Sequence, residues 1–396
     1  MPLDVDITVS DVRSDENFLG PLLPHISKVD CLRLAGYSSI EVVANDLPDF
    51  FASPIPDLSS LELQQDAEPA EAFPLNETTI PPILQKVSKL KSLRLTRTPI
   101  YPTLFSIASL KELKLLGYAN PFDFRTFVGF LRSNLDLELV VLDIQFLADS
   151  VETRFAGKVP LSRLQHLSIT RSKIIDSRGL LSCISLPRGV HVEVISTCRE
   201  PDASRRSFPP SLLTPIHDLL TPITTIKSQL DPQELQVLGN GSSYTFRCAW
   251  APLDVRTVFK RFPITPVREL HIDICRWEFD DKYLSDAIKV LPALEILAIS
   301  GPAMFPVGLF SALTEEPVLC PALKTIAFLN CGISPGVVEK LGEALARRRD
   351  STAARVYRVV IISSTATALD HTSVQQLRKS VPCVEIRVDD KLPDLS

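Results

Sequence analysis

The stretch Val87-Ser88-Lys89-Leu90-Lys91-Ser92-Leu93-Arg94-Leu95 decides the fold, because the chain repeats its pattern of aliphatic residues. The same spacing returns at residues 107–115, 161–169 and 291–299. Each copy ends in two aliphatic residues separated by one other residue, and alternation along a strand turns that pair toward one face. A phrase repeated about every 20–29 residues predicts a solenoid of stacked parallel strands, each followed by a return segment.

The first residue of each final aliphatic pair marks one repeat. In the first half of the chain these residues are Leu32, Leu61, Leu93, Leu113, Leu142 and Leu167. Farther along they are Leu270, Leu297 and Ile326, and Val359 and Val384 continue the series with weaker matches. The residue between the two members of each pair points to the opposite face of its strand, and we expect that face to be exposed.

Several return segments have helical periodicity. Residues 122–131 place four apolar side chains on one helical face, and residues 285–291 do the same over a shorter span. The clearest helix is predicted for residues 334–346, where Ser334 is a favourable N-cap and Pro335 suits the first helical position.

The repeats resemble the leucine-rich-repeat family, in which Cys, Asn, Thr or Ser often follows the strand and satisfies backbone groups at the bend. This resemblance is carried by residues 326–333, 167–174, 93–100 and 270–275. It covers roughly residues 1–198 and 263–396 and implies an α/β leucine-rich-repeat solenoid, or horseshoe. In such a fold a parallel β-sheet lines the concave side, and helical or irregular returns form the convex side.

The middle of the chain departs from the repeat. Residues 234–238 and 243–249 flank Gly239-Asn240-Gly241-Ser242, which is a β-hairpin signal. We therefore expect one continuous solenoid with three parts: residues 1–198 as its N-terminal half, 199–262 as an irregular repeat with a loop and an inserted β-hairpin, and 263–396 as its C-terminal half. The alternative is a break between two solenoid halves within 199–262.

The composition and the absence of known motifs exclude several classes of function. The chain has 396 residues, 45% of them hydrophobic and 22% charged, with a net charge of −5 that argues against a nucleic-acid partner. None of its eight cysteines forms a Cys-x-x-Cys pair, and no signal peptide or membrane span is evident. We therefore expect a cytoplasmic or nuclear protein that has no membrane partner. His-Glu-x-x-His, Gly-x-Ser-x-Gly and phosphate-loop motifs are absent, so we expect no enzyme and no cofactor.

Two local clusters have competing interpretations. Glu269, His271 and Asp273 lie on the exposed side of one predicted strand; a metal could recruit two of them, but a solvated binding face is the commoner case, so we expect no metal site. The run Arg347-Arg348-Arg349 follows the predicted helix. It suggests an acidic or phosphate partner, yet cations that offset the helix dipole are the simpler explanation.

The exposed strand positions are the predicted protein-binding surface, because extended concave faces are how repeat proteins usually bind. Their mixed charges suit a specific protein more than a polyanion. The alternative is that they form only the solvated side of the sheet. These candidates are Arg33, Glu62, Arg94, Glu112, Lys114, Asp143, His166, Glu269, His271 and Asp273.

The repeats are most similar to the C-terminal region of fungal F-box proteins. That resemblance implies a substrate-binding region of a ubiquitin-ligase receptor, whose N-terminal module docks onto the Skp adaptor of a cullin ligase. Here residues 26–34 already fit the repeat, so we expect Skp and cullin partners only if a docking module exists upstream. The alternative is a stand-alone scaffold or inhibitor that binds one protein; an unrecognised hydrolase is the third hypothesis.

Overall fold

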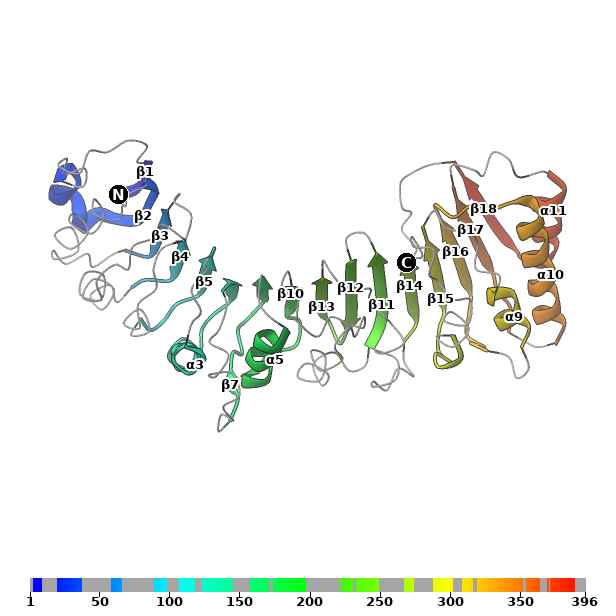
Figure 1. Ribbon diagram of the computed structural model, residues 1–396, viewed down its shortest axis with the longest axis horizontal. Helices are drawn as coiled ribbons and strands as arrows, with labels where there is room; N and C mark the ends of the chain where they lie inside the picture. The colour runs from blue at the N-terminus through cyan, green and yellow to red at the C-terminus, as the bar shows by residue number, and fades with distance from the viewer. Residues whose placement is uncertain are drawn as a thin grey trace. The chain divides into compact units, whose positions relative to one another are not determined.

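The computed structural model, drawn as a ribbon in Figure 1, divides into two compact units, Met1–Glu200 and Pro201–Ser396. The structure describes residues 3–8, 20–37, 58–65, 89–97, 107–117, 123–144, 157–170, 174–196, 220, 223–230, 233–248, 267–273, 288–301, 308–315, 319–351, 354–363, 369 and 371–388.

Unit 1 is built on a ladder of parallel strands. In spatial order they are β1 (Leu3–Thr8), β2 (Val29–Tyr37), β3 (Ser60–Gln65), β4 (Ser92–Thr96), β5 (Glu112–Leu116), β6 (Leu139–Asp143), β8 (His166–Thr170) and β10 (His191–Ser196). The strands follow one another in chain order, as a solenoid requires. A separate pair of short parallel strands joins β7 (Val159–Pro160) to β9 (Ile184–Ser185).

The strand register confirms the predicted repeat. One column of paired, buried residues runs through β2 to β10 and consists of Leu32, Leu61, Leu93, Leu113, Val140, Leu167 and Val192. The choice of Leu142 as a repeat marker was wrong by two residues. Leu142 pairs with Leu115 and Ile169 in the second apolar column, because the β6 phrase begins at Val140.

The returns of unit 1 are helical in part. A 3₁₀ helix, η1 (Gly20–Lys28), leads into β2, and the described part of unit 1 also holds the α-helices α3 (Phe124–Ser133) and α5 (Ile174–Cys183). The helix predicted at residues 122–131 is confirmed as α3, which begins two residues later because Asp123 caps it by accepting from the Thr126 backbone N–H at 2.8 Å. Phe124, Phe127 and Leu131 are buried on its inner face.

Asn134, the residue that follows α3, ties this helix to the preceding repeat. It is 1% exposed, and both the nitrogen and the oxygen of its side-chain amide form hydrogen bonds. Its Nδ2 donates to the carbonyls of Ile107 at 2.8 Å and Phe130 at 3.0 Å, while its Oδ1 accepts from the Leu110 backbone N–H at 3.0 Å. One buried side chain therefore satisfies three backbone groups that have little access to water.

Unit 2 combines an antiparallel start with a parallel ladder. Its order is β13 (Ser242–Cys248), β12 (Gln233–Gly239), β11 (Ile223–Leu230), β14 (Glu269–Asp273), β15 (Ile296–Ser300), β16 (Thr325–Leu329), β17 (Arg358–Ile362) and β18 (Cys383–Arg387). The pairs from β11–β14 to β17–β18 are parallel, and β11–β12 and β12–β13 are antiparallel.

The predicted hairpin of the middle region is confirmed by β12 and β13. Gly239 pairs with Ser242, so Asn240 and Gly241 alone form the loop, with φ of 50° and 75°. Positive φ at both positions is the type I′ geometry that Asn-Gly favours. The hairpin strands extend the same sheet as the repeats through β11.

The parallel part of unit 2 repeats the aliphatic column of unit 1. Its members are Ile226, Leu270, Leu297, Ile326, Val359 and Val384. The Cys expected at the bend after β16 is Cys331, which is buried and donates from Sγ to the Ile299 carbonyl at 3.4 Å. Ser363 lies at the next bend, after β17, and its Oγ donates to the Cys331 carbonyl at 2.8 Å. Small polar side chains therefore link successive repeats.

Among the described residues of unit 2, the helices with complete bounds are α9 (Gly308–Thr314), α10 (Pro335–Ser351) and α11 (His371–Ser380), and α10 packs between the other two. The helix predicted from Ser334 is confirmed, but it runs on to Ser351, so the arginine run lies inside α10 and not after it. Of the helix predicted at 285–291, residues 285–287 lie outside the described residues. No helix among the described residues is long and apolar enough to cross a membrane.

Candidate functional site

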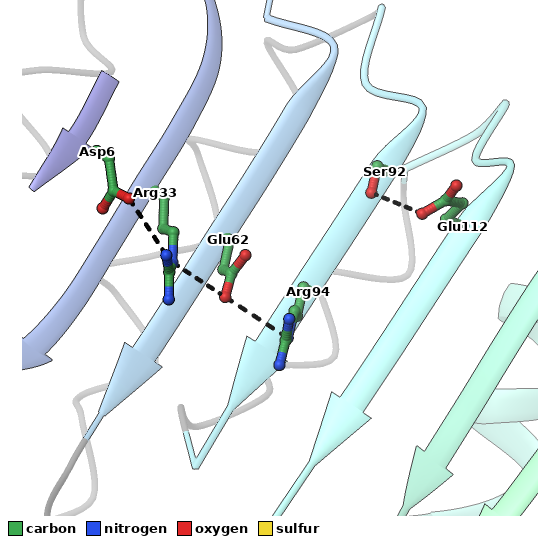
Figure 2. A network of polar contacts seen from close by, with 6 residues as sticks. All are labelled: Asp6, Arg33, Glu62, Ser92, Arg94 and Glu112. Carbon is green, nitrogen blue, oxygen red and sulfur yellow. Dashed lines mark hydrogen bonds and ion pairs between the residues drawn. The ribbon is translucent and has the colours of Figure 1, made fainter. Parts of the chain in front are cut away.

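A polar ladder crosses the outward face of unit 1, between its two aliphatic columns. We define it as Arg33, Glu62, Arg94 and Lys114, which occupy matching register positions on β2, β3, β4 and β5. The Glu62 carboxylate lies between two guanidinium groups, with its Oε1 3.3 Å from Arg33 Nε and 3.5 Å from Arg94 Nε (Figure 2). Arg33 Nη1 also lies 3.2 Å from Asp6 Oδ2.

These ion pairs contribute little to folding. The side chains of Arg33 and Arg94 are 47% and 41% exposed, whereas that of Glu62 is 20% exposed. Partly exposed pairs of this kind stabilise a protein by only about 0.2–1 kcal/mol, because water competes for the guanidinium groups, although the Glu62 Oε1 and Arg94 Nε atoms themselves are buried. The cations are therefore able to exchange Glu62 for an acidic group of a partner at small cost to the fold.

Two neighbouring cations stand out on the polar ladder. Arg94 and Lys114 face each other across β4 and β5, an arrangement that is mildly unfavourable for like charges. Among the residues that the structure describes, Lys114 forms no ion pair. Glu112, two residues before Lys114, accepts a hydrogen bond from Ser92 Oγ at 3.3 Å (Figure 2). The β4–β5 end of the ladder therefore presents positive charge outward.

The other two candidates of unit 1 have local partners. Asp143 Oδ2 accepts from the Gly117 backbone N–H at 3.1 Å and so supports the bend after β5. Gly117 has a φ of 76°, and an added Cβ would lie 2.8 Å from Arg97 Cγ, so this bend requires glycine. The His166 ring stacks on that of His191 with centroids 5.0 Å apart, and burial lowers the pKa of His166. Asp143 and His166 are thus held by neighbours in the sheet.

In unit 2 the structure brings Glu269 and His271 together, with 3.9 Å between the Glu269 Oε2 and His271 Nε2 atoms. The side chain of Asp273 lies outside the described residues. His271 is not the solvated residue that alternation suggested: its side chain is 22% exposed, between Lys227 on β11 and Ala298 on β15. Burial, with a smaller effect of the Lys227 charge, lowers the pKa of His271 to about 4.

We expect this pKa to make folding stability depend on pH. In the unfolded chain this histidine has a pKa of about 6.5, so it binds a proton below that pH. In the folded protein His271 becomes protonated only when the pH falls to about 4. Stability should therefore fall as the pH drops through this window, by about 2–3 kcal/mol from this group. Urea unfolding at pH 7 and pH 4.5 should show a smaller fall for His271→Gln. An equal fall in both proteins would contradict the assignment.

The outward face of β15, β16 and β17 differs from that of unit 1. Its side chains are apolar and at most 5% exposed, and they meet across the strands. They are Ala298, Ala327, Leu329, Val360 and Ile362. The expectation that the residue between the aliphatic pair is exposed is therefore wrong for these strands. The accessible polar ladder belongs to unit 1.

Sequence reasoning missed one further cluster. The ligand atoms of Asp4, Asp30 and Cys31 all lie within 4.8 Å of one another at the start of β1 and β2. Burial and the Asp4 carboxylate raise the pKa of the Cys31 thiol, which disfavours the thiolate that metals bind. The signal in the sequence is too weak to find it, because the three residues meet only through strand pairing. The geometry alone does not define a metal site.

Stacked parallel strands, continuous aliphatic columns and bends supported by small polar side chains define a leucine-rich-repeat solenoid. No family model matches the sequence, and no curated protein matches it. Among solved structures, the fold is similar to the leucine-rich repeat-containing protein LegL7 from Legionella pneumophila, at 10% identity and a TM-score of 0.32, over 90% of this chain and 89% of that chain. The fold assignment rests on register and burial.

Proposed function

We propose that this chain is a protein-recognition module that binds one polypeptide through the polar ladder of unit 1. The observation that carries this proposal is the row of charged side chains in strict register on neighbouring strands. Strands hold such groups more rigidly than loops do, which reduces the entropy lost on binding. The ion pairs are weak enough to be exchanged, so a partner can compete for these charges.

The chemistry of the ladder indicates the kind of partner. The adjacent cations Arg94 and Lys114 favour an acidic side chain, while Glu62 on β3 and Glu112, two residues before Lys114 on β5, favour a basic one. A partner with alternating charges fits this order better than nucleic acid, which would require a continuous basic surface. Of the ten residues predicted from the sequence, we assign the contact to Arg33, Glu62, Arg94, Glu112 and Lys114.

Charge reversal at Arg94 tests the proposal. We expect Arg94→Glu to keep its fold, because the side chain is 41% exposed, and to weaken the complex about tenfold or more through repulsion. The tagged 396-residue chain would be used to recover partners from source cells, with quantitative mass spectrometry of wild type, Arg94→Glu and the exposed control Arg188→Glu. Partners lost only with Arg94→Glu support the proposal; identical partners in all three contradict it.

We further propose, from the resemblance to fungal F-box proteins, that the bound polypeptide is a substrate of a cullin ubiquitin ligase. Under this hypothesis a version extended upstream should co-purify with Skp and cullin subunits. Failure to recover any of them would favour the alternative, a stand-alone scaffold or inhibitor. That alternative predicts a stable complex with one protein in the absence of the ligase, and the same loss with Arg94→Glu.

A further inference from the structure

A cavity of about 200 Å³ opens where α10, the segment before β17 and the end of α11 meet. Its lining includes the apolar residues Leu345, Val356 and Val381, which are at most 4% exposed. The lining also includes Ser380, Pro382 and four basic side chains: Arg349, Arg355, Arg378 and Lys379. Several cations around one cavity attract an anion more strongly than a single exposed cation does, because their potentials add.

Three of the four basic side chains of this cavity have no acidic partner among the described residues. Arg349 pairs with the exposed Asp350, with 2.9 Å between Nε and Oδ1. Arg355, Arg378 and Lys379 form no ion pair among the residues that the structure describes. The cavity is therefore a concentrated positive site on a protein whose net charge is −5.

The helix dipole explains only part of this arrangement. Arg378 and Lys379 lie in the last turn of α11, where cations are favourable, and Arg349 Nη1 donates to the Lys379 carbonyl at 3.0 Å. Arg355 belongs to no helix and comes from a different segment of the chain. Cations from three segments that surround one cavity are more than helix capping requires.

We infer that this cavity binds a phosphate group. Arginine guanidinium groups present paired N–H donors that match the oxygens of phosphate, and one lysine adds a point charge. The cavity is smaller than the ~300–1,000 Å³ typical of sites for whole organic ligands, which favours a phosphate group and the atoms next to it. The phosphate belongs to a small molecule or to a phosphorylated side chain. This site lies in unit 2 and does not depend on the polar ladder.

Isothermal titration of the 396-residue chain with inorganic pyrophosphate at low ionic strength tests this inference. We expect saturable 1:1 binding that Arg355→Gln and Arg378→Gln each weaken about tenfold, since each removes a charge-assisted contact. The control Arg188→Gln, an exposed arginine of unit 1, should bind like wild type. All three positions are exposed, and far-UV circular dichroism would establish that each variant is folded.

A second titration separates the two sources of phosphate. It uses a phosphoserine peptide and its unphosphorylated counterpart. Tighter binding of the phosphopeptide than of pyrophosphate assigns the site to a modified protein, and the reverse assigns it to a small phosphate. Absence of saturable binding by both probes would overturn the inference. So would unchanged affinity in both Gln variants, because the heat would then come from elsewhere on the protein.

Discussion

Arg348→Ala is expected to destabilise unit 2 by about 3 kcal/mol. The Arg348 side chain is among the largest that are fully buried, and the residue is 1% exposed. Its Nη1 donates to the Leu319 carbonyl at 2.8 Å and its Nη2 to the Cys320 carbonyl at 2.6 Å. The alanine variant loses two hydrogen bonds from a charged donor and the packing of the aliphatic stem, while relief of the buried charge offsets part of this loss.

Urea unfolding followed by circular dichroism measures this effect. Arg347→Ala is the matched control, because Arg347 is the preceding residue of α10 and is exposed; its effect should be within about 0.5 kcal/mol. Equal, small effects at both positions would show that Arg348 does not hold α10 against the segment that leads into β16.

Asn134→Ala is expected to destabilise unit 1 by about 3–4 kcal/mol. The change leaves the Leu110 N–H and the Ile107 and Phe130 carbonyls without the partner that Asn134 supplies, and each unsatisfied buried group costs about 1–3 kcal/mol. Asn134→Asp keeps the shape and the acceptor for Leu110, but it turns a carboxylate toward two carbonyls. We therefore expect it to be at least as damaging as alanine.

The neighbouring Ser133 supplies the control for Asn134. Ser133 is exposed, and its Oγ donates only to the Gly129 carbonyl of its own helix at 3.4 Å. Ser133→Ala should change the free energy of unfolding by less than about 0.5 kcal/mol. A similar midpoint of urea denaturation for Asn134→Ala and Ser133→Ala would show that the three hydrogen bonds do not support the repeat.

The repeat itself was predictable from sequence because its cause is local. Alternation fixes which strand residues face inward, so Leu32, Leu61 and Leu93 could be aligned without a structure. The Asn-Gly loop of the β12–β13 hairpin was predictable for the same reason, since positive φ at both loop positions favours that dipeptide. The repeat marker of β6 was predicted at Leu142 and not at Val140, because both residues are aliphatic and alternation places both on the same face of the strand.

The remaining features depend on contacts between distant residues. Arg348 looked like one of three helix-end cations, but its carbonyl partners lie 28 and 29 residues away. The Asn134 side chain forms hydrogen bonds with backbone groups of residues that lie 24 and 27 positions earlier in the chain. The polar ladder was predicted residue by residue, yet its pairing around Glu62 follows from strand register. The basic cavity requires three segments to meet, which no local pattern reveals.

Disulfide trapping tests the central claim, that successive phrases form neighbouring strands in register with their middle residues outward. Arg94 and Lys114 are paired across β4 and β5, at a strand spacing of about 4.8 Å, within reach of a disulfide. Arg33 lies three strands from Lys114, about 14 Å away, beyond that reach. After mild oxidation, peptide mass spectrometry should find an intramolecular bridge in Arg94→Cys/Lys114→Cys and none between the new cysteines of Arg33→Cys/Lys114→Cys. A bridge in the second protein, or none in the first, would contradict the register on which the fold and the proposed binding face depend.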